Sequence, residues 1–186
     1  MAVAQRMSEA AYIEFVESGV EGDWELHDGV LVEKPGMSWD HGRIVTRLLS
    51  WLDQLLDPAE FVVFTELRVR RPADTVFLPD IMVVPTSYGE AFQGRPGTLA
   101  IFTEPLPLVV EVWSLSTGEY DVETKIPVYV QRGDLEIWRI HPYERTLTRW
   151  VRQPDGSYKE STHRHGAVSP VALPAAEIDL DRLFAL

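Results

Sequence analysis

The stretch Leu108-Val109-Val110-Glu111-Val112-Trp113 places a single carboxylate inside an otherwise apolar run. Such a run is typical of a central strand that is covered on both faces by other layers of the protein. An ionised carboxylate in that setting costs several kcal/mol unless a charged partner compensates it. Glu111 therefore indicates either a buried ion pair or a functional site at the centre of a sheet.

Two further residues stand in similarly unexpected contexts. Asp80 closes Phe77-Leu78-Pro79-Asp80 within a second nearly continuous apolar run, and Lys125 lies between Asp121 and Tyr129. If the two apolar strands are neighbours, Asp80 and Glu111 can converge on one cation, whose charge offsets their desolvation. Since the chain has no cysteine, oxygen or imidazole must hold any metal. Mg²⁺ needs only one or two carboxylates and keeps several waters.

The N-terminal part predicts a helix, a hairpin and a long helix. A short amphipathic helix is expected between Ser8 and Gly19. Strands Trp24–His27 and Val30–Lys34 flank Asp28-Gly29, a dipeptide that favours a tight hairpin turn. A long helix from Ser38 is expected to end before Pro58, because its apolar residues recur with a period near 3.6. These are Ile44, Val45, Leu48, Leu49, Leu52, Leu55 and Leu56.

Alternation and apolar runs predict the strands of the sheet. Phe61–Arg70 alternates as a half-exposed strand, and Phe77–Val84 and Leu106–Trp113 are continuous enough for central strands. The segment 85–105 has no clear period and is interpreted as a loop. An antiparallel meander is expected from three later strands, Leu135–Ile140, Thr146–Arg152 and Tyr158–His163.

Between these strand groups, Asp121–Gln131 is expected to form a helix that Gly133 ends. Pro127 has no backbone N–H, so this helix either begins near Ile126 or kinks there. The apolar tail, which contains Ile178, Leu180, Leu183 and Phe184, is expected to dock on the core.

Composition limits the class of protein. With 186 residues and 45% hydrophobic content, the chain is expected to form one domain over residues 1–186. No apolar run reaches the ~20 residues of a membrane helix, which favours a cytoplasmic protein without membrane contact. A net charge of −12 disfavours indiscriminate binding to a polyanion, so any contacts with DNA should be local.

An ordered series of motifs spans nearly the whole chain. They are Trp24-Glu25-Leu26-His27-Asp28-Gly29, His41, Leu78-Pro79-Asp80, Glu111-Val112-Trp113-Ser114 with Ser116-Thr117, Asp121, Lys125-Ile126-Pro127-Val128-Tyr129, and Gly133 before Glu136-Ile137-Trp138. In this order they resemble the Uma-two family of restriction endonuclease-like domains, within the PD-(D/E)xK nuclease superfamily. The PD dipeptide alone is common, whereas the ordered set is specific.

The resemblance implies a fold, a reaction and a set of roles. It implies an α/β fold in which helices flank a restriction-endonuclease-like central mixed sheet, with the antiparallel C-terminal meander added. The implied activity is hydrolysis of DNA phosphodiester bonds with Mg²⁺ or Mn²⁺ as cofactor. Asp80 and Glu111 would be the metal ligands, and Lys125 would orient or deprotonate the attacking water. Glu25, His41 and Asp121 are supporting candidates.

One position departs from the superfamily pattern. The superfamily lysine follows the second acid by two residues, where this chain has Trp113. The resemblance implies that Lys125, from the following helix, takes over the vacated role.

Other interpretations of the same residues remain open. Asp80 could be a strand-end carboxylate bonded to backbone, Glu111 could form a buried ion pair with Lys125, and His41 is expected to be a cap or surface residue. The whole chain could be a non-catalytic nuclease-fold module for interaction or self-association. A hydrolase of a small phosphorylated molecule is a third alternative and would need a closed pocket. A homodimer is expected, because most soluble assemblies are two-fold.

Overall fold

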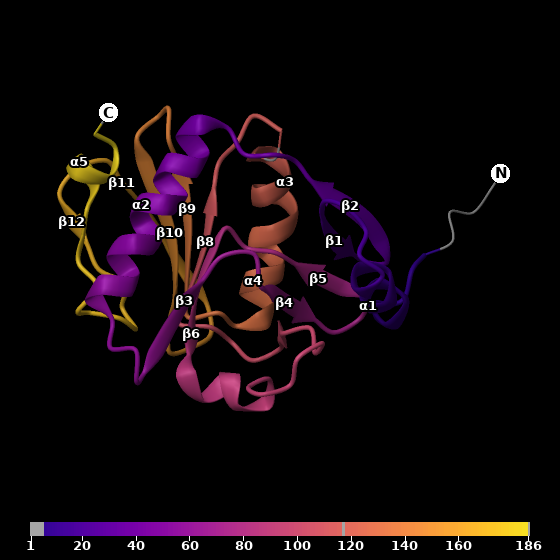
Figure 1. Cartoon of the computed structure of the whole chain (residues 1–186). Coiled ribbons are helices and arrows are strands. Elements are labelled where there is room, and N and C mark those ends of the chain that lie inside the picture. The colour runs from indigo at the N-terminus through magenta and orange to yellow at the C-terminus, as the bar shows by residue number, and fades with distance from the viewer. Residues whose placement is uncertain (1–5, 117, 186) are drawn as a thin grey trace.

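The computed structural model describes residues 6–116 and 118–185, and Figure 1 shows the arrangement of their helices and strands. Six strands form the central sheet in the order β11-β10-β9-β8-β6-β3. Neighbours pair antiparallel except β8 and β9, which run parallel, so the sheet is mixed as predicted. The strands are β3 (Phe61–Phe64), β6 (Ile81–Pro85), β8 (Leu108–Val112), β9 (Glu136–His141), β10 (Thr146–Arg152) and β11 (Tyr158–His163).

A second sheet has the order β2-β1-β5-β4-β7. Its strands are β1 (Asp23–His27), β2 (Val30–Lys34), β4 (Arg68–Arg71), β5 (Thr75–Phe77) and β7 (Ile101–Phe102). Helix α1 (Glu9–Glu17) begins at the N-cap Ser8 and packs on this sheet through the buried Tyr12. The predicted hairpin is confirmed: His27 pairs with Val30, and the turn at Asp28-Gly29 has φ angles of 46° and 81°.

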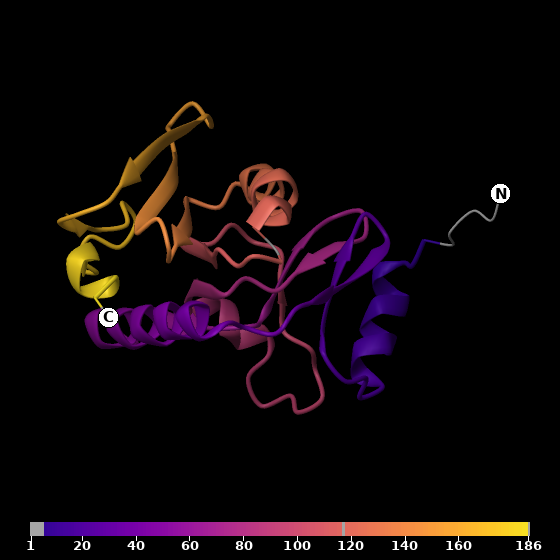
Figure 2. The same ribbon diagram turned by 90° about the horizontal axis from the view of Figure 1, so that it is seen from above.

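Helices cover both faces of the central sheet (Figure 2). Helix α2 (Trp39–Leu55) lies on one face and buries its predicted apolar stripe there. The short helix α5 (Leu180–Leu183) and the end of the tail pack into the same core, as expected, next to the small ladder of β12 (Ala167–Val168) and β13 (Ile178–Asp179). The other face holds α3 (Gly118–Tyr120), the π-helical turn η2 (Asp121–Lys125) and α4 (Ile126–Arg132).

Two predicted strands are each divided between the two sheets. The strand predicted over Phe61–Arg70 breaks at Glu66, whose φ is 58°, into β3 and β4. The strand predicted over Phe77–Val84 breaks at Pro79-Asp80 into β5 and β6. Pro79 cannot donate to a strand ladder, which favours an interruption at this point. Asp80 therefore stands at the junction of the sheets, immediately before β6.

The segment 85–105 and the helix after β8 also differ in detail from the prediction. The predicted loop contains the 3-10 helix η1 (Thr86–Ala91) and β7, which pairs parallel to β4. Pro127 is accommodated because it lies in the first turn of α4, where its missing N–H is not needed. The predicted antiparallel meander is present as β9, β10 and β11, and it extends the central sheet beyond β8.

Candidate functional site

Asp80 and Glu111 come from neighbouring antiparallel strands. Ile81 of β6 pairs with Val110 of β8, and this register, continued by one residue, brings Asp80 opposite Glu111. Both are almost fully buried, with relative exposures of 4% and 1%. Asp80 is contacted from α2 and Glu111 from η2 and α4, and both side chains line one cavity at this end of the two strands.

Asp80 is held by three elements. Its Oδ1 lies 2.7 Å from Lys34 Nζ at the end of β2, and its Oδ2 lies 3.0 Å from His41 Nε2 in α2. The backbone N–H of Val112 in β8 also donates to Oδ2, at 2.7 Å. Burial by itself would raise the pKa of Asp80, but the Lys34 charge and the His41 contact outweigh it and hold the pKa well below the usual value. Asp80 is therefore an ionised, fixed carboxylate.

Glu111 has a different electrostatic environment. Its Oε1 accepts hydrogen bonds from Lys125 Nζ at 3.0 Å and from the Tyr129 hydroxyl at 2.5 Å. Complete burial nevertheless raises its pKa to about 8, and the nearby carboxylates of Asp80 and Asp121 act in the same direction. The two acids thus have pKa values displaced in opposite directions, which is common at functional sites and also occurs in structural ion-pair networks.

Lys125 bridges two acids of different sheets. Its Nζ lies 2.8 Å from Glu25 Oε1 of β1 and 3.0 Å from Glu111 Oε1 of β8. Burial alone would lower the pKa of Lys125, but the charges of Glu111 and Glu25 raise it well above the usual value. The two acids therefore favour the charged ammonium form of Lys125. Glu25 also accepts from the backbone N–H of Leu78, at 2.8 Å.

The π-helical turn η2 places two residues of one helix at this site. In η2 the Ile126 N–H donates to the carbonyl of Asp121, five residues earlier, and both Asp121 and Lys125 are buried. Single π turns inside helices are rare and recur at functional sites. Here the wider turn directs Asp121 and Lys125 toward β8.

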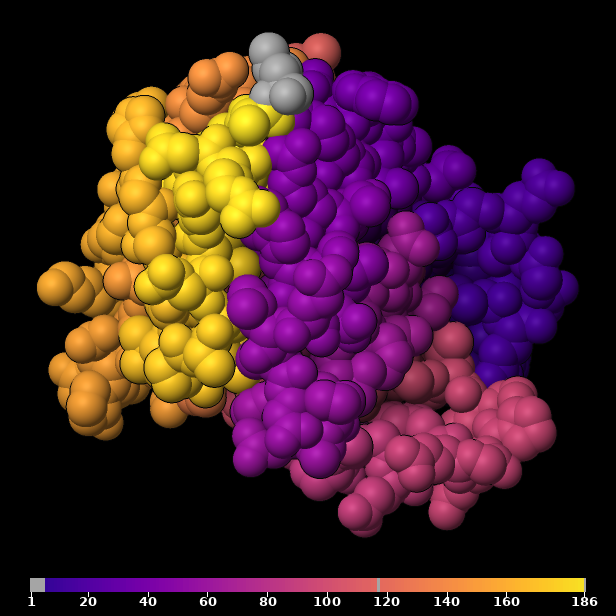
Figure 3. All heavy atoms as spheres, turned by 60° about the vertical axis from the view of Figure 1, so that its left-hand side comes forward, coloured from indigo at the N-terminus to yellow at the C-terminus, as the bar shows by residue number. Residues whose placement is uncertain are grey.

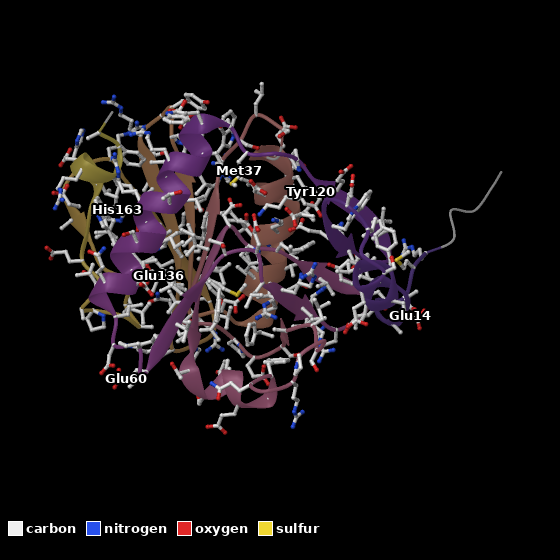
Figure 4. The ribbon with its side chains drawn as sticks, viewed as in Figure 1. Glu14, Met37, Glu60, Tyr120, Glu136 and His163 are labelled. Atoms are coloured by element: carbon white, nitrogen blue, oxygen red, sulfur yellow. The ribbon has the colours of Figure 1, made fainter. Side chains whose placement is uncertain are left out.

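All of these charged side chains, together with His41, line one cavity of about 210 Å³. Met37, from the segment between β2 and α2, and Tyr120, from α3, border it and lie on the same side of the molecule in Figure 4. The lining includes the buried carboxylates Glu25, Asp80, Glu111 and Asp121, but only the ammonium groups of Lys34 and Lys125. When all four buried acids are ionised, they exceed the two ammonium groups by two negative charges, which a divalent cation would neutralise.

The donor set fits a magnesium-type site with few protein ligands. Among residues 6–116 and 118–185, no three His, Asp or Glu side chains are arranged to hold a metal together. Mg²⁺ does not require three, because one or two carboxylates and several waters complete its shell. A carboxylate offers about four acceptor positions. The three contacts described for Asp80 therefore leave capacity for a cation.

Sequence reasoning found the central residues, named His41 only as a supporting candidate, and missed Lys34. Asp80, Glu111 and Lys125 were predicted and are brought together. His41, expected as a cap or surface residue, is instead 5% exposed and bonded to Asp80, a correction that follows from the packing of α2 over β6. Lys34 was not singled out. The signal available was its rarity, since the chain has three lysines and Lys34 ends a predicted strand.

Trp113, at the superfamily lysine position, makes a contact of another kind. Its indole stacks on the His141 ring with a centroid distance of 4.3 Å and an interplanar angle of 23°. The lysine position on β8 is thus occupied by an aromatic stack, and the only ammonium groups that line the cavity within the described part of the chain are those of Lys34 and Lys125.

Comparisons with known proteins agree with this architecture. A family model named Uma2 and described as "Putative restriction endonuclease" matches residues 11–181. A crystal structure described as a "putative nuclease belonging to DUF820" from Anabaena variabilis ATCC 29413 superposes with a TM-score of 0.74 and 21% sequence identity. The similarity covers 92% of this chain and 95% of that chain. No curated protein matches significantly. Among the described residues, no helix is long and apolar enough to cross a membrane.

Proposed function

This chain belongs to the Uma2 family, described as "Putative restriction endonuclease", and from that premise we propose that it is a Mg²⁺- or Mn²⁺-dependent endonuclease that hydrolyses phosphodiester bonds of DNA. The observation that supports this proposal best is the convergence of Asp80, Glu111 and Lys125 on one cavity with an excess of carboxylates. A buried cluster of this kind is expensive to maintain for stability alone, because each desolvated charge needs compensation.

Asp80 and Glu111 are the residues that would hold the cation, and their oxygen donors suit Mg²⁺ and Mn²⁺. When bound, such an ion supplies Lewis-acid stabilisation of the negative charge that develops on a phosphate oxygen. Lys34 and His41 fix both oxygens of Asp80, so this ligand is oriented before substrate arrives. Tyr129 and Lys125 both donate to Oε1 of Glu111 and orient that carboxylate.

Lys125 is proposed to position the attacking water and to stabilise charge. Its ammonium group donates hydrogen bonds and carries a fixed charge within the cavity. Since the charges of two buried acids favour its protonated form, its contribution is orientation of the water and electrostatic stabilisation.

Calorimetric titration of Mg²⁺ and Mn²⁺ into the wild-type protein and into an Asp80→Ala/Glu111→Ala variant tests the proposal, together with DNA cleavage by both proteins. We expect binding heat and metal-dependent cleavage from the wild-type protein alone. Equal binding heats for the two proteins would show that the metal does not bind at Asp80 and Glu111. Cleavage retained by the double variant would remove the catalytic assignment.

The alternative, a non-catalytic nuclease-fold interaction module, is favoured by one observation. The charged groups of the cavity already satisfy one another: Lys125 bridges Glu25 and Glu111, and Lys34 pairs with Asp80. A scaffold would need no more. Such a module would show neither saturable metal binding nor cleavage. Sedimentation would measure its self-association, which also tests the proposed homodimer.

A further inference from the structure

The outer surface of α2 carries a regular pattern of aromatic and basic side chains. Trp39, Arg43, Arg47 and Trp51 follow one another at intervals of four residues and line a groove of about 780 Å³. Residues four apart lie on one side of a helix, and the span from Trp39 to Trp51 is about 18 Å at ~1.5 Å per residue. Figure 3 looks onto this side of α2, with the C-terminal segment alongside it.

Trp39 is the most exposed of these side chains. It has 85% of its surface exposed, and no other described tryptophan appears among the large hydrophobic residues on the surface. The remaining groove residues are mostly small or polar: Ser38, Gly42, Thr46 and Ser50. An exposed indole among small polar residues is unlike the aliphatic surface of a typical obligate protein interface, and it leaves room for a planar group to stack.

The two arginines of the groove have little compensating negative charge. Arg47 donates to the backbone carbonyls of Arg182, Leu183 and Ala185, which carry no net charge. Arg43 donates to the backbone carbonyl of Ala185 as well, and it lies 3.8 Å from Asp40, a long separation for an ion pair. The guanidinium of Arg182 lies over the Trp51 ring, 5.3 Å from its centroid. In a chain with a net charge of −12, this surface is therefore a local basic strip.

The groove meets the acidic cavity at one residue. Met37 lines both, and it is 57% exposed. On the other side of the cavity, Leu115 is 92% exposed between Ser114 and Ser116, which also line the cavity. The acids themselves are only 1–4% exposed. A strand must bend into this recess for its phosphate to reach them, which a flexible strand does at lower cost than a stiff duplex.

We propose that the groove of α2 binds single-stranded DNA and guides it into the cavity, so that unpaired strands are the substrate class of the proposed nuclease. Unpaired bases expose the faces that stack on Trp39, while Arg43 and Arg47 contact the phosphates. A duplex hides those faces. The cleavage step in this proposal rests on the proposed function. The preference for unpaired DNA rests on the groove of α2.

Fluorescence anisotropy with a labelled oligonucleotide of about 16 nucleotides, long enough for known single-strand sites, tests the binding step without metal. We expect the wild-type protein to bind it at least about tenfold more tightly than a hairpin duplex, and Trp39→Ala to weaken this binding about tenfold or more. Arg43→Gln should reduce the slope of the logarithm of the binding constant against the logarithm of the salt concentration by about one. That is the change expected when one phosphate contact is lost. Tyr143→Ala is the matched control, since Tyr143 is 60% exposed and lines neither cavity.

Tighter binding to the duplex, or unchanged single-strand binding by Trp39→Ala, would overturn the inference. So would a dimer that Trp39→Ala converts to monomer without any effect on DNA, because the groove would then be a contact between copies. Different results would contradict the proposed nuclease function and the proposed preference for single strands. Asp80-dependent cleavage of duplex DNA that ignores Trp39 would refute the strand choice alone, whereas Trp39-dependent single-strand binding without any cleavage would refute the nuclease alone.

Discussion

Lys125 Nζ lies 3.0 Å from Glu111 Oε1, although the lysine comes from the helix after β8 and not from β8 itself. The same ammonium group contacts Glu25 in the second sheet. One cation thus joins both sheets and the helix at the cavity. The site needs no lysine on β8, because the π-helical turn η2, which precedes α4, brings Lys125 to Glu111. Trp113 occupies the position that the superfamily gives to lysine.

Lys125→Met should lower both stability and turnover. Removal of the ammonium group leaves Glu25 and Glu111 buried without their shared partner, which should cost about 3–5 kcal/mol of unfolding free energy. Urea denaturation measures this loss. The variant Lys125→Met/Glu25→Gln removes one acid as well and should recover part of the stability but not the cleavage rate. Recovery of both would show that Lys125 has only a structural role.

Asp80→Asn should abolish metal-dependent cleavage while the fold persists. The amide preserves the shape of the side chain and can still accept from the Val112 N–H, but it loses the charge that a cation needs. Circular dichroism and a plasmid-nicking assay measure the two effects. Asp53→Asn, an exposed carboxylate of α2, is the matched control and should leave both unchanged.

Glu111→Gln should remove a pH dependence of stability in the metal-free protein. Burial raises the folded-state pKa of Glu111 to about 8, above the usual value of 4.5 for an unfolded chain. The stability linked to this proton is present below the unfolded pKa and is lost as the pH rises through the folded pKa. Relative to Glu111→Gln, the wild-type protein should therefore lose stability between about pH 5 and about pH 8.

Urea titrations of chelator-treated samples of both proteins at each pH measure the free energy of unfolding. Equal slopes for both proteins would show that Glu111 is ionised throughout, held by Lys125 and Tyr129. In either case Glu111→Gln should remove cleavage, since the proposed ligand has lost its charge.

Local patterns in the sequence predicted most of the elements. The turn at Asp28-Gly29, the cap at Ser8 and the left-handed Gly133, with a φ of 81°, each depend on a few adjacent residues. The apolar run around Glu111 likewise predicted a covered strand, and β8 is buried throughout. Such features are readable because their causes lie within one helical turn or one hairpin.

The remaining features depend on contacts between distant segments. Lys34 and Asp80 are 46 residues apart, and His41 and Asp80 are 39 apart, so no local pattern could pair them. The division of Phe77–Val84 between two sheets was partly signalled by Pro79. The groove of α2 was not predicted at all, because the four-residue spacing of Trp39, Arg43, Arg47 and Trp51 acquires meaning only when the rest of the surface is known to be acidic or covered.

Gly118→Ala should disturb the site through Trp113. A Cβ atom at Gly118 would lie 1.9 Å from Trp113 Nε1, far inside contact distance, and the indole cannot yield easily because it stacks on His141. We expect a loss of about 1–3 kcal/mol, typical of overpacking, together with reduced cleavage, since Gly118 begins the helical segment that continues into η2. Urea denaturation followed by tryptophan fluorescence measures the first effect.

Gly42→Ala is the matched control, because a Cβ atom there meets nothing within 4 Å and Gly42 lies inside α2. Alanine in an open helical position should stabilise the protein by about 0.5–1 kcal/mol. Opposite signs for the two glycines would support a close approach between α3 and the end of β8. If Gly118→Ala were as stable as the wild-type protein, the indole of Trp113 would have to be free to move, and the position that the superfamily gives to lysine would be a tolerant one.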